Sequence, residues 1–292
     1  MAVAEPYVPQ PIARGLRGLR PVRQARAVLS TGEIVGLALF GLLIVVAVLA
    51  PAIAPNSATV PAGQPFTPPF HGGLLFGTDE VGFDIFSRVL FGLRTSLLAA
   101  FAVIASGVVV GGIIGLIAGV VGGLVDNLLM RFTDLFLALP GPVLAIAVVA
   151  AIGPGFSHTL LAVAIVWWPF YARIVRSEVR ALAARPHLEA ARLSGAGPAR
   201  RALRHLLPGA VPAVIVTASL DVGNLVVTLA ALSFLGLGAP APAPELGAMA
   251  ARGLQYLLQE WWVPILPGIA VFVLALTANL AGDAFRTLFG DR

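Results

Sequence analysis

The chain has 292 residues, of which 58% are hydrophobic and 11% are charged, and its mean hydropathy is +0.93. A soluble domain of this length needs more charge on its surface, so the composition excludes the ordinary soluble classes and indicates a membrane protein. The absence of cysteine excludes disulfides and thiol chemistry, and the net charge of +5 rests on arginine because lysine is also absent. Most of these arginines flank apolar runs, a pattern typical of membrane topology rather than of nucleic-acid binding.

Residues 1–32 are polar and carry spaced arginines, which predicts a cytoplasmic, partly disordered lead-in before a membrane domain over 33–292. A helix of about 20 apolar residues crosses the hydrocarbon of a bilayer. Six apolar runs follow, at about 34–54, 95–122, 133–152, 158–175, 209–235 and 264–285. Ala52-Ile53-Ala54 imitates a signal-peptide cleavage site, but the long basic lead and the following proline favour a retained first span.

Six spans place both termini on the same side of the membrane. If that side is the cytoplasm, the lead-in, the 123–131 turn, the 176–204 segment and the C-terminal arginines all lie inside. The outside loops then keep only Arg88, Arg94 and Arg252. Because positively charged loops stay in the cytoplasm, the sequence predicts an all-α membrane protein with N-in, C-in topology.

The 176–204 segment is rich in Ala, Leu, Arg and Glu, which are strong helix formers. Pro186 can begin a helix and Gly195 can end one, so we expect a short helix at about 186–195, outside the membrane. Two interpretations fit its small side chains and its charge. It offers a docking surface to another protein, or it is a basic anchor that rests on lipid headgroups.

The same segment contains Glu189-Ala190-Ala191, Gly195 and His205-Leu206-Leu207-Pro208. This pattern resembles the cytoplasmic EAA loop of ABC-importer permeases. The resemblance implies a type I ABC-importer permease fold, in which the loop is a coupling helix that sits in a cleft of a cytoplasmic ATPase. It assigns coupling to the ATPase to Glu189, Ala190, Ala191, Gly195, His205 and Pro208.

Residues 76–97 resemble the signature of the C-type permease subunit in dipeptide, oligopeptide and nickel importers. Phe76 and Phe83 depart from that signature, whereas its polar residues are present, namely Thr78, Asp79, Asp84, Ser87, Arg88 and Arg94. Asp84 and Arg88 lie four residues apart, so we expect them to pair on one face of an interfacial helix. The apolar side of that helix would carry Phe83, Phe86 and Leu90. We interpret the segment as a structural elbow before the second span, with substrate contact as the alternative.

Two later runs resemble the same family. The first is Leu232-Ser233-Phe234-Leu235-Gly236-Leu237-Gly238, followed by a Pro-rich loop with Pro240, Pro242 and Pro244 and then by Glu245, Gly247 and Met249, where Leu246 replaces the usual Trp. The second is Asn279-Leu280-Ala281-Gly282-Asp283 with Arg286. Between them, we expect Trp261 and Trp262 to lie at the membrane interface.

Two features lie within the apolar runs. Gly107, Gly111, Gly115 and Gly119 are spaced by four residues on one face of span two, which favours close packing inside the subunit, with a sliding surface as the alternative. Asp221 is the clear mid-span carboxylate, with Asn224 nearby. It either lines the translocation pathway, where it meets a peptide amine or a cation, or pairs with a partner subunit. Asp126, Arg131 and Asp134 are expected to form structural ion pairs.

The chain has no phosphate-binding Gly-x-x-x-x-Gly-Lys-Ser/Thr motif, and its four histidines are scattered over different loops. We therefore expect no ATP hydrolysis, bound metal, other cofactor or enzyme active site in this chain. The resemblance implies one permease subunit of an ABC importer for di- or oligopeptides in a bacterial inner membrane, with nickel, haem or another small solute as alternatives. The rivals from other classes are a carrier driven by an ion gradient and an intramembrane enzyme or assembly factor.

The same resemblance implies the partners. They are a homologous second permease subunit in a heterodimer, two cytoplasmic ATPase subunits or domains that hold ATP and Mg²⁺, an extracytoplasmic substrate-binding protein, and membrane lipid.

Overall fold

The computed structural model describes residues 29–289, so most of the predicted lead-in lies outside the described residues. The described chain consists of helices and loops with two isolated β-bridges, which confirms the predicted all-α class. The helices are α1 (Thr31–Ile53), α2 (Ile85–Val121), α3 (Gly123–Leu137), α4 (Gly141–Ile152), α5 (Phe156–Ala183), α6 (Pro186–Leu193), α7 (Pro198–Arg201), α8 (Leu207–Leu232), α9 (Leu246–Gly253) and α10 (Trp262–Phe289). Two π-helical turns flank α8, η1 (Ala202–Leu206) and η2 (Ser233–Leu237), and a short 3₁₀ turn, η3 (Leu254–Tyr256), follows α9.

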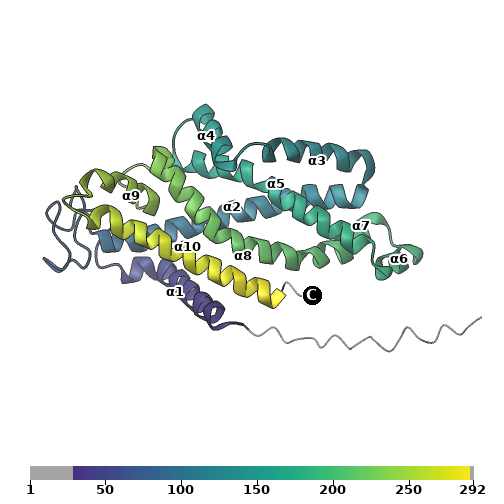
Figure 1. The fold of residues 1–292 in the computed structure, drawn as a ribbon, viewed down its shortest axis with the longest axis horizontal. Helices are drawn as coiled ribbons and strands as arrows, with labels where there is room; N and C mark the ends of the chain where they lie inside the picture. The colour runs from purple at the N-terminus through teal and green to yellow at the C-terminus, as the bar shows by residue number, and fades with distance from the viewer. Residues whose placement is uncertain (1–28, 290–292) are drawn as a thin grey trace, which may run out of the picture.

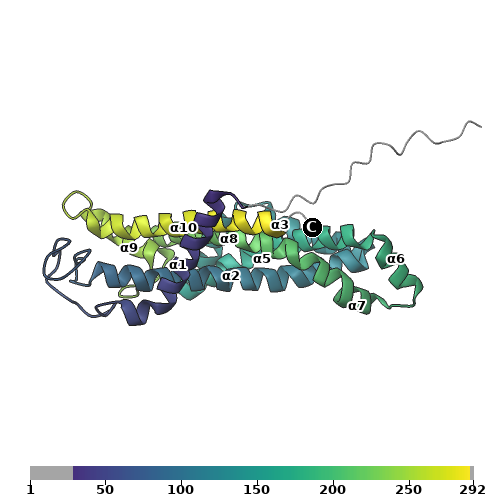
Figure 2. The same ribbon diagram turned by 90° about the horizontal axis from the view of Figure 1, so that it is seen from below.

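The helices form an elongated bundle with two different ends, as Figure 1 and Figure 2 show. The 54–84 loop and α9 lie at one end, here named the α9 end, and α6 and α7 lie at the other, the α6 end. A capping box between Ser30 and Glu33 begins α1. Thr287 donates a hydrogen bond to Glu33, so α1 begins beside the point where α10 ends. The first and last residues of the described helices therefore lie on the same side of the bundle.

Within residues 29–289, five helical segments are long and apolar enough to cross a membrane, namely α1, α2, α5, the continuous run from α7 through α8 to η2, and α10. The span predicted at about 133–152 is not one continuous helix, because α3 and α4 meet there at an angle of 86°. The break falls at Leu139-Pro140-Gly141-Pro142, where proline removes backbone donors and the residue before it avoids the helical region. The bent pair counts as a sixth span only if both halves are taken together.

The second span is longer than predicted, because α2 begins at Ile85 rather than near residue 95. The separate interfacial helix expected around 83–90 is therefore wrong. Phe83 precedes α2, and Phe86 and Leu90 lie on its first turns. The predicted Pro-rich loop at 240–244 is confirmed, and a short helix, α9, follows it directly. Glu245 begins this helix, since its carboxylate accepts hydrogen bonds from the backbone N–H groups of Gly247 at 2.9 Å and Ala248 at 2.8 Å.

The glycine face of α2 packs against α5, which confirms that it is used inside the subunit. A Cβ at Gly107 would lie 3.0 Å from the Tyr171 ring, and a Cβ at Gly119 would lie 2.9 Å from Val179 Cβ. At Gly111 and Gly115 the nearest neighbours include backbone atoms of α5. The two helices thus approach more closely than any side chain on this face would allow.

Ion pairs join α3 to the same helix near the α6 end. They are Asp126 with Arg176 and Arg180, and Asp134 with Arg173 at 2.6 Å. This confirms the structural pairs predicted for Asp126 and Asp134, whereas Arg131 is exposed and forms no ion pair among the described residues. With 37 residues, α2 is roughly 55 Å long, against a hydrocarbon thickness of about 30 Å. The length of α2 therefore exceeds one crossing of the hydrocarbon, and its last turns pack with α3 and α5 near the α6 end.

Candidate functional site

The short helix α6 begins and ends where the sequence predicts a helix outside the membrane. Pro186 occupies its first position, where a missing N–H costs nothing. Gly195 lies just past its end with φ +80°, a left-handed conformation that favours glycine. The N–H of Gly195 donates to the Arg192 carbonyl and the N–H of Ala196 to the Ala191 carbonyl, each at 3.0 Å. These two bonds form a Schellman motif, so Gly195 serves to end the helix.

One leucine attaches α6 to the long helices. Leu188 is only 4% exposed and packs in a small apolar cluster that α5, η1 and the start of α8 complete with Val175, Val179, Leu182, Leu206 and Ala210. The opposite side of α6 is open. Glu189 and Ala190 are exposed, Ala191 is half-buried, and Leu193 is 81% exposed at the tip. This side of α6 is therefore largely free of contacts with the rest of the described chain.

The remaining residues of the coupling pattern follow α6 in the chain. His205 lies in η1 and Pro208 at the second position of α8, and both are exposed. The His205 ring forms no hydrogen bond to Glu189 within the part of the chain that is described. The structure thus places all six predicted residues on exposed or half-exposed surface, and Gly195 also ends the helix.

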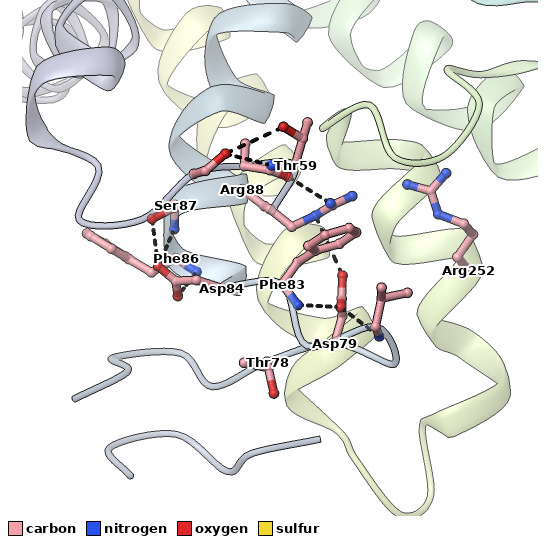
Figure 3. A network of polar contacts seen from close by, with 12 residues as sticks. Thr59, Thr78, Asp79, Phe83, Asp84, Phe86, Ser87, Arg88 and Arg252 are labelled. Atoms are coloured by element: carbon pink, nitrogen blue, oxygen red, sulfur yellow. Dashed lines mark hydrogen bonds and ion pairs between the residues drawn. The ribbon is translucent and has the colours of Figure 1, made fainter. Parts of the chain in front are cut away.

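The elbow residues at the α9 end form a buried polar network, which Figure 3 shows. Asp84 caps α2, because its carboxylate accepts hydrogen bonds from Phe86 N at 3.1 Å, Ser87 N at 3.3 Å and Ser87 Oγ at 2.6 Å. The predicted pair between Asp84 and Arg88 is therefore wrong, since the cap already uses the carboxylate. Asn56 Nδ2 also donates to Asp84 Oδ2, at 3.1 Å, and so connects the network to the end of α1.

Arg88 pairs instead with residues that precede the helix. Its Nε lies 3.6 Å from Asp79 Oδ2, its Nη1 donates to the Ala58 carbonyl at 2.9 Å, and its guanidinium lies 4.7 Å from the centre of the Phe83 ring (Figure 3). Asp79 in turn accepts hydrogen bonds from the backbone of the turn that follows it. These contacts hold the 54–84 loop against α2, as expected of a structural elbow.

Of the two remaining residues of this segment, Thr78 is buried in the network and Arg94 lies outside it. Thr78 is fully buried, its hydroxyl donates to the Gln64 carbonyl at 2.6 Å, and its own carbonyl accepts from Trp262 Nε1 at 3.2 Å. Trp262 is accordingly buried, whereas Trp261 is exposed, so only one of the predicted interfacial pair faces outward. Arg94 is exposed and lies outside the network.

Asp221 in α8 is buried and held by two side chains of α5. Its Oδ2 accepts hydrogen bonds from Trp167 Nε1 at 3.0 Å and from the Tyr171 hydroxyl at 2.8 Å. Nothing in the sequence identifies these partners, which lie 54 and 50 residues away. The interaction joins two spans through one carboxylate.

A cavity of about 520 Å³ opens beside Asp221 at the bend between α3 and α4, and is here named the bend cavity. Its walls include Phe136 and Leu137 of α3, Trp167 and Phe170 of α5, and Asp221 and Asn224 of α8. The structure thus brings the two predicted pathway residues to one cavity. Within residues 29–289, no group of three or more His, Cys, Asp or Glu side chains is arranged to hold a metal ion.

Comparison with known proteins identifies relatives along most of the chain. It is 39% identical over 264 residues to the di/tripeptide transport system permease protein DppC of Pseudomonas aeruginosa (strain UCBPP-PA14). The aligned region covers 87% of this chain and 86% of that protein. It is also 39% identical over 217 residues to the probable D,D-dipeptide transport system permease protein DdpC of Escherichia coli (strain K12). Here the aligned region covers 74% of this chain and 73% of that protein.

The fold is similar to a chain of the inward-facing MetNI methionine ABC transporter, with a TM-score of 0.54 and 23% identity, over 68% of this chain and 94% of that chain. Residues 111–292 match the family model for the binding-protein-dependent transport system inner membrane component. This match covers more than half of the chain, and the relatives extend it toward the N-terminus. The chain therefore belongs to the family of binding-protein-dependent transport system inner membrane components, the multi-pass permeases of bacterial inner membranes.

Proposed function

We propose that this chain is one permease subunit of an ABC importer that carries di- and oligopeptides delivered by an extracytoplasmic binding protein. The names of its relatives support peptides over nickel, haem or another small solute. The observation that carries the proposal is α6, an exposed short helix fixed to α5, η1 and α8 through Leu188 at one end of the bundle. A carrier driven by an ion gradient has no need of such a docking surface.

In the proposed topology the α6 end is cytoplasmic and both termini lie inside. The arginines of α5, α6, α7 and η1 gather at this end, as the positive-inside rule requires. The 54–84 loop and α9 then face the outside, where a binding protein would dock. The same topology gives α6 access to cytoplasmic ATPase subunits or domains, which would hold ATP and Mg²⁺.

Coupling would follow from packing. A closely packed cluster transmits displacement because it cannot be compressed. Movement of α6 by a closing ATPase would therefore shift Leu188 and, with it, the ends of α5 and α8. These two helices carry Trp167, Tyr171 and Asp221, so the displacement would reach the bend cavity. A second, homologous permease subunit would form the other half of the pathway, with Asp221 and Asn224 facing it.

Uptake by the purified importer in proteoliposomes tests this proposal. Accumulation of a labelled dipeptide should require ATP and the binding protein, and uptake driven by an ion gradient alone would contradict the proposal. Glu189→Lys should abolish both uptake and capture of the ATPase, because it would place a positive charge against an ATPase surface that is complementary to a negative one. Glu260→Lys makes the same change at the α9 end and should leave ATPase capture intact. Normal uptake by the Glu189 variant would remove the coupling role of α6.

A further inference from the structure

The carboxylate of Asp221 has more acceptor capacity than the protein uses. A carboxylate offers about four lone-pair sites on its two oxygens. Trp167 and Tyr171 both donate to Oδ2, and the Asn224 side chain lies beside the same carboxylate, so at most three donors of α5 and α8 meet these sites on a residue that lines the bend cavity. The two hydrogen bonds also fix the orientation of the group, because they hold it between two spans. Such a fixed carboxylate is a preorganised acceptor.

Within residues 29–289, no positively charged side chain balances the charge of Asp221. Asp221 is the one ionisable side chain among the described residues that line the bend cavity. No arginine or histidine of the described chain forms an ion pair with it. A carboxylate within a span is costly unless it meets a positive charge or water, so it marks a site for a cation.

The walls of the cavity decide which kind of cation fits. Three aromatic side chains line it: Phe136, Trp167 and Phe170. Aromatic faces attract organic ammonium groups, through the ring quadrupole, without requiring several oxygen ligands. A Ca²⁺ or Mg²⁺ ion that has lost its waters needs about six oxygen ligands from the protein, which one carboxylate and an aromatic wall do not supply. The volume of about 520 Å³ lies in the range of small-molecule sites rather than of a single ion.

We propose that the bend cavity is a subsite for a protonated amine, such as the amino terminus of a peptide in transit. The amine would donate to Asp221 Oδ1 and lie against Trp167 and Phe170. The identification of the amine as that of a peptide rests on the proposed transport function, whereas the preference for an organic cation rests on the cavity alone. The subsite would orient a peptide with its amino end toward α8.

The absence of cysteine allows a direct test in the assembled importer, since an introduced thiol is the only one in this chain. In Asn224→Cys the thiol lines the bend cavity beside Asp221. Its rates of modification by a trimethylammonium methanethiosulfonate and by a sulfonate methanethiosulfonate are measured in lipid nanodiscs. The ratio of the two rates is divided by the ratio at Leu258→Cys, a position 93% exposed at the α9 end, which corrects for intrinsic reactivity.

We expect a normalised preference for the cationic reagent of about tenfold or more, because a cleft with one sign of charge concentrates counter-ions. Adding Asp221→Asn should reduce it to about one, since the amide can still accept from Trp167 and Tyr171 but carries no charge. A ratio near one in the Asn224→Cys chain, a ratio that survives Asp221→Asn, or no modification by either reagent would overturn the proposal.

A second measurement separates the amine from other cations. Dialanine should slow modification of Asn224→Cys, whereas N-acetyl-dialanine, which lacks the charged amine, should not. Equal protection by both would overturn the amine assignment. These rates require neither ATP nor the binding protein, so a failure of peptide uptake would contradict the proposed function without deciding this test.

Discussion

The close approach of α2 and α5 leads to a sharp prediction for two adjacent glycines. In Gly111→Ala the new Cβ would lie 2.8 Å from both Ala172 N and Tyr171 Cβ, and also against the Trp168 carbonyl oxygen. Favourable carbon contacts lie at about 3.5–4.0 Å, and two of these neighbours are backbone atoms that cannot rotate away. The helices must therefore separate. At Gly112 an added Cβ meets nothing within 4 Å, which makes Gly112→Ala the matched control.

The magnitude follows from two opposing effects. Replacing glycine by alanine inside a helix favours the helix by about 0.5–1 kcal/mol, and both variants gain this. Overpacking costs about 1–3 kcal/mol, and only Gly111→Ala incurs it. The variants should therefore differ by about 1–3 kcal/mol in the free energy of unfolding. At roughly 2–4 °C per kcal/mol, this corresponds to about 2–12 °C in apparent unfolding temperature.

The assay is the temperature at which half of the purified protein loses its folded peak in detergent, at one heating rate. Gly112→Ala should match or slightly exceed the natural chain, and Gly111→Ala should fall below it. Equal unfolding temperatures for the two variants would refute the close packing of α2 on α5.

Three other predictions test separate parts of the structure. Arg88→Lys should expose the 54–84 loop to limited proteolysis, because lysine cannot bond the Ala58 carbonyl while stacking on the Phe83 ring, and Arg94→Lys should not. Asp126→Asn should lower the apparent unfolding temperature by a few degrees, since it leaves two arginines of α5 without their carboxylate; an unchanged temperature would mean that these partly exposed pairs are screened. In intact cells an impermeant maleimide should label Leu258→Cys at once and Leu193→Cys only after permeabilisation, and the reverse order would invert the proposed topology.

Hydropathy predicts the straight spans well and the broken one badly. The apolar run at 133–152 continues through Pro140, so a hydropathy window does not detect the break there. The two prolines and the glycine at 140–142 were the available signal, because they disfavour a continuous helix. The error has a consequence for function, since the bend at this point forms one wall of the bend cavity.

Spacing rules failed where a residue lies at a helix boundary. The four-residue rule holds only inside a helix, and Asp84 is the cap of α2 rather than a member of it. An aspartate before an apolar run, with a serine three residues later, was the signal for a cap. Partners far apart in the chain, such as Trp167 and Tyr171 for Asp221, have no local signal and emerge only from tertiary packing.

For the proposed coupling helix α6, the sequence predicts the ends of the helix but not its attachment to the bundle. Pro186 and Gly195 mark the two ends of α6, and both act as their chemistry predicts. Sequence does not reveal that Leu188 is the residue that joins α6 to the spans, because the cluster draws on α5, η1 and α8 together. In the proposed mechanism, that contact is the route by which a movement of α6 would reach the spans.

The most direct test of the central claim, that this chain is the permease subunit of an ATPase-driven importer, is purification of the tagged chain from native membranes in a gentle detergent. Mass spectrometry of the co-purifying proteins should identify an ATPase and a second multi-span permease. Recovery of the chain alone, or only with copies of itself, would contradict the claim and favour a carrier driven by an ion gradient.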